Sequence, residues 1–445
     1  MMPDNVVPIR PGGDDGGAAG DWMDRLSRGR RGEIAKVGRN AQLILIHDQR
    51  WRDVIAWDDF RQAIVSCKEP PWDDDLRPAV VHREWTDSDI IRVQSWLQDR
   101  HSLQLGREVV GDAVLLVAER SSSHEVRDYL QGLEWDGVSR VGSWASRYLG
   151  AEHNAYTELV SRYYLTSAVA RIMEPGCKVD TMIVLEGAQG ARKSTALKTL
   201  FGAEWFSDTP LDLESKDRFV ALRGNWGNEW AELDAMRKSD IARIKSFLSS
   251  SRDRYRPPYG RGLIDVPRQC VFAGTTNPDA YLRDPTGNRR FWPVRCGYVD
   301  VEQLAADRDQ LWAEARTIYE SYAAGEHSCR WWPEGDEIAL LRGEQEERVE
   351  PDPWDDIVAD WAADRLEMGY ITTAEVLGTA LNIDAGKRSR ADEGRVGAIL
   401  GRLGWTRTRR RVKGTRRYVY VPPSVPTLPG IELGRDRGRD SGKDE

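Results

Sequence analysis

Residues 181–197 read TMIVLEGAQGARKSTAL, and this stretch decides the fold. Its apolar, β-branched start predicts a buried strand that stops at Gly187, and a helix is expected to begin near Lys193. The backbone N–H groups at the start of a helix favour bound anions, and glycines allow the preceding loop to close around phosphate oxygens. The stretch therefore predicts a phosphate-binding loop between a strand and a helix.

The spacing of this loop follows the nucleotide-binding pattern GxxxxGK[ST], except that Arg192 occupies the position of the second glycine. Lys193 is expected to contact the β- and γ-phosphates of ATP, and the Ser194 hydroxyl to bind Mg²⁺. A chance glycine-rich turn is the alternative, but only 11 of the 64 basic residues are lysines, so a lysine here is informative. Arg192 leaves open whether the loop supports fast turnover. The predicted nucleotide-binding residues are Gly187, Gln189, Gly190, Ala191, Arg192, Lys193, Ser194 and Thr195.

The composition is that of a globular protein: 445 residues, 40% hydrophobic and 31% charged, with a net charge of −8. No apolar run approaches the ~18 residues of a membrane span, and the N-terminus lacks the pattern of a secretory signal. We therefore expect a cytoplasmic protein without membrane contact. The five cysteines are scattered and form no CxxC pair, which gives no support to a zinc site or a disulfide framework.

The chain is predicted to contain an α/β core with a parallel sheet, flanked by two smaller parts. Strand-like and helical runs alternate in the core, as in parallel strands joined by helical crossovers. Upstream, short amphipathic segments predict a small, mainly helical region in which Thr86 followed by Asp89 marks a helix start. Downstream, three short helices and a ribbon that turns at Lys413-Gly414 give the order of a winged-helix-like domain. The predicted boundaries are a disordered tail at 1–34, the N-terminal region at 35–145, the core at 146–335, a linker helix at 336–352, the winged-helix-like domain at 353–421 and a second tail at 422–445.

Polar residues stand at the ends of two predicted strands downstream of the loop. Glu229 and Glu232 lie at the end of the strand candidate 225–230, and Asn277 follows the strand candidate 269–274. Hydrolysis of ATP needs an acid near Mg²⁺, a group that polarises water and a group that senses the γ-phosphate. We expect Glu229 to act on the metal, Glu232 on the water and Asn277 on the γ-phosphate, although the two glutamates could exchange roles. The alternatives are solvated glutamates at a helix start and an ordinary Asn-Pro turn.

The paired arginines Arg289 and Arg290 precede an aromatic, strand-like run. One of them could project into the nucleotide of a neighbouring subunit, where such a finger is worth about 10³–10⁵ in rate. The alternative is a pair of surface arginines in an arginine-rich chain.

The segments GAQGARKST, NEWAELDAM, DRYRPPYGR, VFAGTTN and TGNRRFWPV follow one another between residues 187 and 294. In combination they resemble the virulence-associated E family of phage- and island-encoded helicases of the superfamily 3 type. The resemblance is close over residues 125–300 and looser in the flanks. It implies an AAA+-like P-loop ATPase core that uses ATP and Mg²⁺ and works as a homo-oligomeric ring, usually a hexamer. It assigns the Walker A role to Lys193 and Ser194, the Walker B role to Glu229 and Glu232, the sensor role to Asn277, and the finger in trans to Arg289 or Arg290.

The resemblance also implies a hairpin, between the acidic segment and the Asn277 strand, that faces the pore of the ring and grips single-stranded DNA. In this chain the region reads SRDRYRPPYGRGLIDVPR. Its basic and aromatic side chains are of the kind that contact phosphates and stack on bases, and bridging between subunits is their alternative role. The candidate DNA-contacting residues are Arg254, Arg256, Tyr259 and Arg261.

A second basic segment, residues 401–420, contains eight basic residues and no acidic one. Alternate residues of a strand share a face, so Arg407, Arg409 and Arg411 are expected to project together, with Lys413 at the turn. Such a surface could contact DNA phosphates. The alternatives are a solvated face or a docking surface for another protein.

These features favour an ATP-dependent DNA helicase or translocase, a DNA-stimulated ATPase acting in replication of a phage or mobile element. The first alternative is an ATP-switched DNA-binding initiator with little unwinding activity, which Arg192 keeps open. A small-molecule kinase is a third reading, but it explains neither the basic ribbon nor the paired arginines. Many members of the family carry an N-terminal primase, and the N-terminal region here is too short for one. We therefore expect any primase to be a separate protein.

Overall fold

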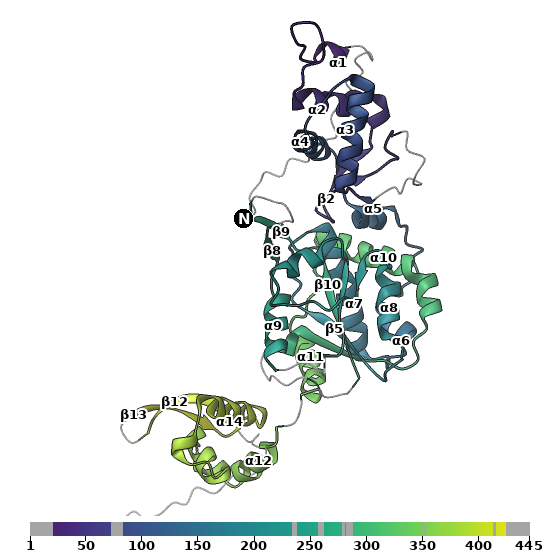
Figure 1. The fold of residues 1–445 in the computed structure, drawn as a ribbon. Coiled ribbons are helices and arrows are strands. Elements are labelled where there is room, and N and C mark those ends of the chain that lie inside the picture. The colour runs from purple at the N-terminus through teal and green to yellow at the C-terminus, as the bar shows by residue number, and fades with distance from the viewer. Residues whose placement is uncertain are drawn as a thin grey trace, which may run out of the picture. The chain divides into compact units, whose positions relative to one another are not determined.

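The computed structural model describes residues 21–72, 83–233, 238–256, 262–277, 281, 288–349, 352–412 and 415–423. The chain divides into two compact units, Met1–Arg348 and Val349–Glu445 (Figure 1). No helix in the described part of the chain is long and apolar enough to cross a membrane.

A five-stranded sheet forms the centre of the first unit, in the order β11-β5-β10-β7-β6. Every pair of neighbouring strands is parallel, so the predicted parallel sheet is confirmed. Because the strands are parallel, all their carboxyl ends lie at one edge of the sheet and all their amino ends at the other. The strands are β5 (Met182–Glu186), β6 (Phe206–Ser207), β7 (Gly227–Trp230), β10 (Val271–Thr276) and β11 (Phe291–Arg295).

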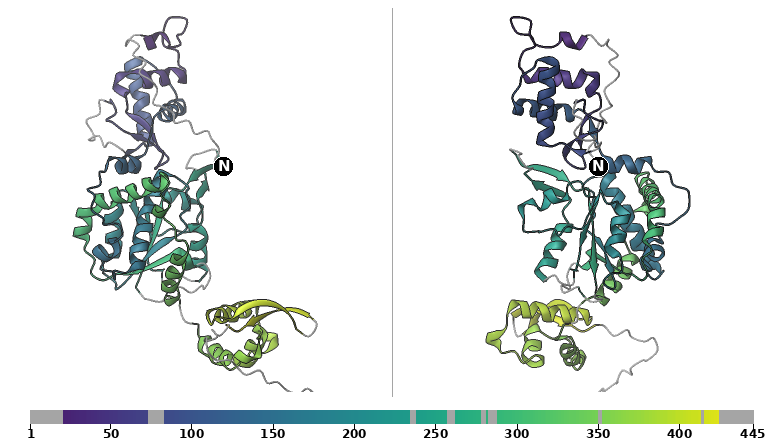
Figure 2. Two further views of the ribbon diagram at one scale, coloured as in Figure 1. Left: turned by 180° about the vertical axis from the view of Figure 1, so that it is seen from behind. Right: turned by 45° about the vertical axis from the view of Figure 1, so that its right-hand side comes forward.

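Helices cover both faces of this sheet (Figures 1 and 2). One face carries α7 (Ala155–Met173), α8 (Lys193–Phe201) and α10 (Val301–Ala323), and the other carries α9 (Lys238–Leu248). The strands are buried along nearly their whole length, as expected of a sheet covered on both sides.

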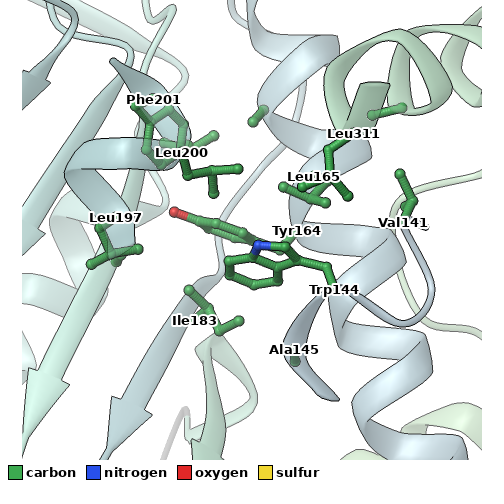
Figure 3. Close-up of a cluster of buried hydrophobic side chains, with 14 of the residues drawn as sticks. Val141, Trp144, Ala145, Tyr164, Leu165, Ile183, Leu197, Leu200, Phe201 and Leu311 are labelled. Atoms are coloured by element: carbon green, nitrogen blue, oxygen red, sulfur yellow. The ribbon is translucent and has the colours of Figure 1, made fainter. Parts of the chain in front are cut away.

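The core between the sheet and the first set of helices is apolar and aromatic. Trp144 and Tyr164 stack at its centre, with Ile183 of β5, Leu197 of α8 and Leu311 of α10 around them (Figure 3). Burial of such large apolar side chains is the main favourable contribution to folding, and here it fixes α8 against the sheet and α10 against α7 and α8.

The N-terminal part has its own apolar core, built around α2 (Gly38–His47), α3 (Asp87–His101) and α4 (Arg107–Ala118). The helix start predicted at Thr86 is confirmed, because Thr86 and Asp89 form a reciprocal capping box. The expectation of a mainly helical region missed a four-stranded sheet, β3-β2-β1-β4, whose strands of two to four residues are too short to give a clear alternation. Its strands are β1 (Ile55–Asp58), β2 (Ala63–Ser66), β3 (Arg83–Glu84) and β4 (Ser122–Ser123).

Two further boundaries differ from the prediction. Residues 21–34, expected to be part of a tail, include α1 (Asp21–Asp24) and bury Leu26, whereas residues 1–20 and 424–445 lie outside the described residues. The helices α5 (Glu125–Gly132) and α6 (Trp144–Leu149) pack into the core of the large sheet, because their apolar residues Val126 and Trp144 are fully buried there.

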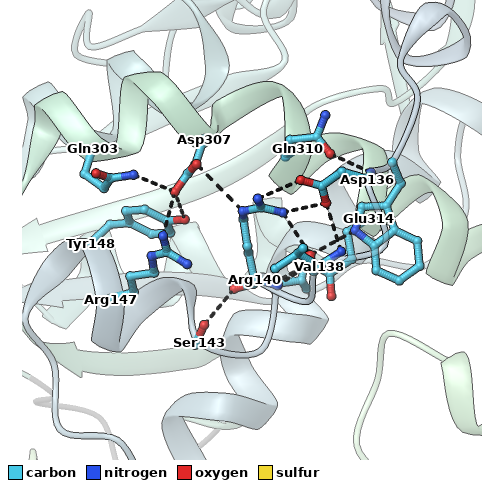
Figure 4. Close-up of polar contacts among 12 residues, drawn as sticks. Asp136, Val138, Arg140, Ser143, Arg147, Tyr148, Gln303, Asp307, Gln310 and Glu314 are labelled. Carbon is cyan, nitrogen blue, oxygen red and sulfur yellow. Dashed lines mark hydrogen bonds and ion pairs between the residues drawn. The ribbon is translucent and has the colours of Figure 1, made fainter.

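Polar contacts hold the segment around α6 against α10 (Figure 4). The Glu314 carboxylate accepts hydrogen bonds from the backbone N–H groups of Arg140 at 2.5 Å and Val141 at 2.8 Å. In the second turn of α10, Asp307 accepts a hydrogen bond from the Tyr148 hydroxyl at 2.8 Å. The N-terminal half of α10 is therefore fixed both by packing and by hydrogen bonds.

The helix α11 (Asp336–Glu347), expected to be a linker, belongs to the first unit. Gln345 is buried and donates from Nε2 to the Phe291 carbonyl of β11 at 2.9 Å. Arg348, which follows α11, forms a buried ion pair with Glu186 at 3.2 Å. A mainly charged sequence conceals this packing, because only one narrow face of the helix is buried.

A two-stranded hairpin, β8 (Arg252–Tyr255) and β9 (Ile264–Pro267), lies between β7 and β10 in the chain, where the family resemblance implied one. The side chain of Arg268 anchors its base: it donates to Asp253 at 2.5 and 3.1 Å and to the Phe247 carbonyl at 2.5 Å. The residues at the tip, 257–261, lie outside the described residues.

The second unit contains helices followed by a two-stranded ribbon, in the predicted order. Val358, Leu377, Ile399 and Trp405 form its small core. Its elements are α12 (Asp355–Ala363), α13 (Thr373–Glu375), η7 (Val376–Ala380), α14 (Arg390–Arg402), β12 (Thr406–Val412) and β13 (Thr415–Val421). Short helical turns elsewhere are η1 (Gln49–Trp51), η2 (Lys216–Leu222), η4 (Asn288–Arg290), η5 (His327–Cys329), η6 (Leu366–Met368) and η8 (Ala385–Lys387).

Candidate functional site

The loop 187–192 joins β5 to α8 at the carboxyl edge of the sheet. Three of its residues have positive φ angles: Gly187 at 150°, Gly190 at 82° and Arg192 at 61°. Glycine adopts this backbone conformation without strain, whereas arginine does so at a cost. The loop therefore curls back towards the start of α8, which gives the predicted strand, loop and helix.

Lys193 is the first residue of α8, and its side chain is buried. Its ammonium donates hydrogen bonds to the carbonyl oxygens of Gly187 at 2.6 Å and Ala188 at 2.9 Å. The positive charge is thus held inside the curl of the loop, at the N-terminus of a helix. A phosphate group placed there would meet both the ammonium and the free N–H groups of the first helical turn.

Glu229 is a buried carboxylate at the carboxyl end of β7. Its Oε1 accepts hydrogen bonds from the hydroxyls of Ser194 and Thr275, each at 2.7 Å. Its Oε2 is buried and has no hydrogen-bond partner among the described residues. An unpartnered carboxylate oxygen next to a hydroxyl is the kind of oxygen ligand set that Mg²⁺ takes alongside phosphate oxygens and water, so Glu229 and Ser194 fit that ion.

Glu232 and Asn277 lie at the same edge of the sheet. Asn277 directly follows β10, and its neighbour Thr276 accepts a hydrogen bond from the Gly187 N–H at 3.3 Å, so Asn277 adjoins the loop. Glu232 lies two residues beyond β7 with an exposed side chain and a φ of 53°, an uncommon conformation for a glutamate. The structure thus joins Ser194 to Glu229 by a hydrogen bond, holds the Lys193 ammonium inside the adjoining loop, and places Asn277 beside that loop.

The side chain of Arg192 points away from the interior of the loop. Its guanidinium donates two hydrogen bonds to the Glu302 carboxylate, at 2.7 and 3.0 Å, at the start of α10. Hydrogen bonding to Glu302 raises the pKa of Arg192, and the same contact lowers the pKa of Glu302. The residue that departs from the glycine pattern therefore contributes its backbone to the loop and its charge to a neighbouring helix.

Arg289 and Arg290 lie at the opposite, amino edge of the sheet, in η4 just before β11. The Arg289 side chain is 72% exposed and lies 3.8 Å from the carboxylate of Asp180. Arg290 donates from Nε to the Ser249 hydroxyl at 3.0 Å. The structure does not bring either arginine to the loop of its own chain.

The side chains of Arg254 and Arg256 are exposed, and Arg254 is paired in register with Asp265 across the hairpin. Tyr259, Arg261 and Lys413 lie outside the described residues.

In the ribbon, Arg407, Arg409 and Arg411 pair with Tyr420, Tyr418 and Arg416, so the three arginines share a face as predicted. The guanidinium groups of Arg407 and Arg409 lie 3.9 and 4.8 Å from the centre of the Tyr418 ring.

The sequence prediction missed three side chains that shape these sites. The Thr275 hydroxyl donates a hydrogen bond to Glu229, and Glu302 forms an ion pair with Arg192. The Tyr418 ring lies against the guanidinium group of Arg407 in the ribbon. A threonine one residue before the end of a strand and two residues before Asn277 was a usable signal for Thr275. Nothing local in the sequence marks Glu302, which lies 110 residues from Arg192.

The fold and the site define a mixed α/β protein in which a glycine-containing loop and a buried carboxylate meet at the carboxyl edge of a parallel sheet. Residues 130–350 match the virulence-associated protein E-like domain. The chain therefore carries a domain of the virulence-associated protein E family, as its sequence predicts.

Solved structures of the NrS-1 C-terminal region in its apo state are distantly similar. Two of them are 12% and 13% identical to this chain, with TM-scores of 0.38 and 0.39, and each alignment covers 66% of this chain and 78% of the other. No curated protein matches the chain.

The left-handed backbone of Arg192 gives a stability prediction. Replacement by glycine or by alanine removes the ion pair with Glu302, but only alanine retains the strain of a positive φ. We expect the Arg192→Gly protein to be more stable than the Arg192→Ala protein by about 1 kcal/mol. The measurement is urea denaturation of the full chain, and Glu302→Gln should lower stability in the parent but not in the Arg192→Gly background. An alanine variant as stable as the glycine variant would contradict the left-handed assignment.

Proposed function

We propose that this protein is an ATP-hydrolysing DNA helicase or translocase that acts in the replication of a phage or another mobile genetic element. The observation that carries the proposal is the buried Glu229 carboxylate, which accepts a hydrogen bond from Ser194 of the loop helix and has one oxygen without a partner in the described part of the chain. A buried charged oxygen without a partner is costly, and a bound cation would remove that cost.

The remaining residues at this edge fit roles in ATP hydrolysis. The Lys193 ammonium, now bonded to two loop carbonyls, is placed to donate to phosphate oxygens instead. Mg²⁺ would neutralise charge on the phosphates, and Ser194 and Glu229 are the residues that would hold it. Glu232, exposed beyond β7, would polarise the attacking water, and Asn277 beside the loop would orient it. This is a P-loop ATPase of the AAA+-like kind that the family resemblance implies.

The positions of Arg289 and Arg290 support a ring of subunits. Five residues of β5 separate the two edges of the sheet, about 16 Å at 3.3 Å per residue, so neither arginine is near the loop of its own chain. A finger from this edge would have to serve the loop of a neighbouring subunit. Such a head-to-tail contact closes into a ring, for which we propose a hexamer.

Two basic surfaces would contact DNA. The exposed Arg254 and Arg256 lie on a hairpin whose base is held rigidly by Arg268, so the hairpin could move with the core when it grips a single strand. In the second unit, which we propose to be winged-helix-like, Arg407, Arg409 and Tyr418 combine charge with an exposed aromatic ring. Both surfaces suit phosphate contact and stacking without base-specific recognition.

The alternative of an ATP-switched initiator rested on crowding of the loop by Arg192. The ion pair with Glu302 directs that side chain away from the loop interior, and this favours turnover. Any primase would be a separate protein, and we propose that this chain acts in the cytoplasm.

The first test is ATP turnover of the purified full chain with and without single-stranded DNA. We expect DNA to stimulate turnover, and Lys193→Ala to lower it by at least ~10²-fold because the phosphates lose their principal charge partner. Lys198→Ala is the matched control: this lysine lies on the same helix, its side chain is exposed, and its loss should leave turnover unchanged. Unchanged turnover in Lys193→Ala would refute the assignment of the loop, and ATP binding without DNA-stimulated turnover would favour the initiator.

Mixed rings test whether an arginine acts between subunits. Arg289→Ala or Arg290→Ala should bind ATP but hydrolyse it poorly, and mixing with Lys193→Ala subunits should restore turnover. The restored sites would combine an intact loop from one chain with an intact arginine from the other. Turnover that stays at the sum of the two separate variants would exclude action in trans.

Variants of the ribbon test its contact with DNA. We expect the double variant Arg407→Ala and Arg409→Ala to weaken duplex binding and to flatten the slope of log affinity against log salt by about 1.8, since each lost phosphate contact contributes about 0.9. Lys387→Ala, an exposed base elsewhere in the second unit, is the control and should change neither. An unchanged slope in the double variant would remove the ribbon from the DNA-binding surface.

A further inference from the structure

Tyr298 is a strongly exposed aromatic residue beside the loop 187–192. Its side chain is 78% exposed, the largest value among the exposed large hydrophobic residues of the described chain. Two residues before it lies Cys296, whose backbone N–H donates a hydrogen bond to the Glu186 carbonyl at 2.8 Å. A Cβ added to Gly187 would lie 3.2 Å from the Cys296 carbonyl, so this segment runs directly alongside the start of the loop.

The backbone around Tyr298 is fixed from several sides. Gly297 donates to the Leu149 carbonyl, and Asp300 donates to the Tyr148 carbonyl, each at 2.9 Å. Gly150 has a φ of 64°, and a Cβ there would lie 2.7 Å from the backbone N and O of Tyr298, so only glycine allows this approach.

The helix α6, which carries these carbonyl groups, is itself held by α10. The Tyr148 hydroxyl and the Arg147 guanidinium both contact Asp307, at 2.8 and 3.1 Å (Figure 4). The Tyr298 ring thus projects into solvent from a backbone that packing and hydrogen bonds hold in place. A preorganised group of this kind loses little conformational entropy when it binds a ligand.

The surroundings of Tyr298 also connect it to the loop electrostatically. Glu302 has the main effect in raising the pKa of Arg192, and the Tyr298 hydroxyl contributes in the same direction. The segment that carries the exposed Tyr298 ring runs alongside Gly187 at the start of the loop, so the ring is available to a ligand whose phosphates the loop binds. Base–aromatic stacking uses such a face and does not depend on which base is present.

We propose that the Tyr298 ring stacks on the base of the nucleotide whose phosphates the loop 187–194 binds. This inference rests on the proposed function, because it assumes a nucleoside triphosphate in the loop. Since stacking reads the flat face of a base and not its hydrogen-bonding edge, Tyr298 contributes equally to adenine and guanine nucleotides.

The test separates the base from the phosphates. Dissociation constants for ATP, GTP and inorganic tripolyphosphate, each with Mg²⁺, are measured by calorimetry on the full chain and on Tyr298→Ala and Tyr298→Phe. We expect Tyr298→Ala to weaken ATP and GTP by about 5- to 150-fold, the equivalent of about 1–3 kcal/mol per stacked base. Tripolyphosphate should bind all three proteins equally, and Tyr298→Phe, the matched variant that keeps the ring, should bind ATP like the parent.

Equal ATP affinity in the parent and in Tyr298→Ala would overturn the proposal. An equal loss of affinity for tripolyphosphate would also overturn it, because the side chain would then act on the loop and not on the base. If the parent chain hydrolyses ATP and Tyr298→Ala binds ATP normally, only the role of Tyr298 fails. If the parent binds neither ATP nor tripolyphosphate, the proposed function fails and this inference with it.

Discussion

The hydrogen bonds to the buried Glu229 carboxylate are the constraint on which the candidate site depends. A buried carboxylate is costly to desolvate, and the hydroxyls of Ser194 and Thr275 offset part of that cost. The three residues come from β7, α8 and β10, so these two hydrogen bonds tie the loop helix to two strands of the sheet. The register that pairs Ala273 with Glu229 makes this possible. The next residue, Trp230, points to the opposite face of the sheet, where its ring stacks on that of Phe272 with 4.7 Å between the ring centres. A slip of one residue would exchange the two side chains and place the carboxylate among the aromatic rings beside α9.

The parts of the fold that depend on local sequence could be predicted, and those that depend on distant contacts could not. The run 181–197 carries its own strand, loop and helix signals, and Thr86 with Asp89 carries a complete capping box. The position of β10 between β5 and β7 comes from pairing between segments some 40 to 90 residues apart, which no local pattern encodes. The packing of α11 was hidden for a different reason, because the buried Gln345 and Arg348 look like solvent-exposed residues in the sequence.

The same distinction applies to the site. Lys193, Ser194 and Glu229 follow from spacing and from the ends of predicted strands, and the structure joins Ser194 to Glu229 by a hydrogen bond. The direction of the Arg192 side chain could not be deduced, because it depends on a φ of 61° and on Glu302 in a helix far along the chain. The position of Arg289 was within reach of sequence reasoning: a residue just before a parallel strand lies at the amino edge, whereas a residue just after one lies at the carboxyl edge. Once the sheet is known to be parallel, an arginine before β11 and a lysine after β5 must lie at opposite edges.

The two edges of the sheet are connected by β10, which runs from the candidate site at one edge to the hairpin at the other. β10 ends at the loop with Asn277, and its other end continues through Gln269 and Arg268 into β9 of the hairpin. Arg268 binds Asp253 of β8, and its guanidinium lies 5.6 Å from the centre of the Phe272 ring in β10. The hairpin base is therefore attached to the strand that carries Thr275 and Asn277. Separating this buried ion pair would leave both charges without a partner in the interior, which is costly. A shift of β10 would therefore carry the hairpin with it as one body. In the helicase proposed above, coupling between hydrolysis and DNA movement would then need no flexible linkage inside a subunit, and the movement would be taken up at the contacts between subunits.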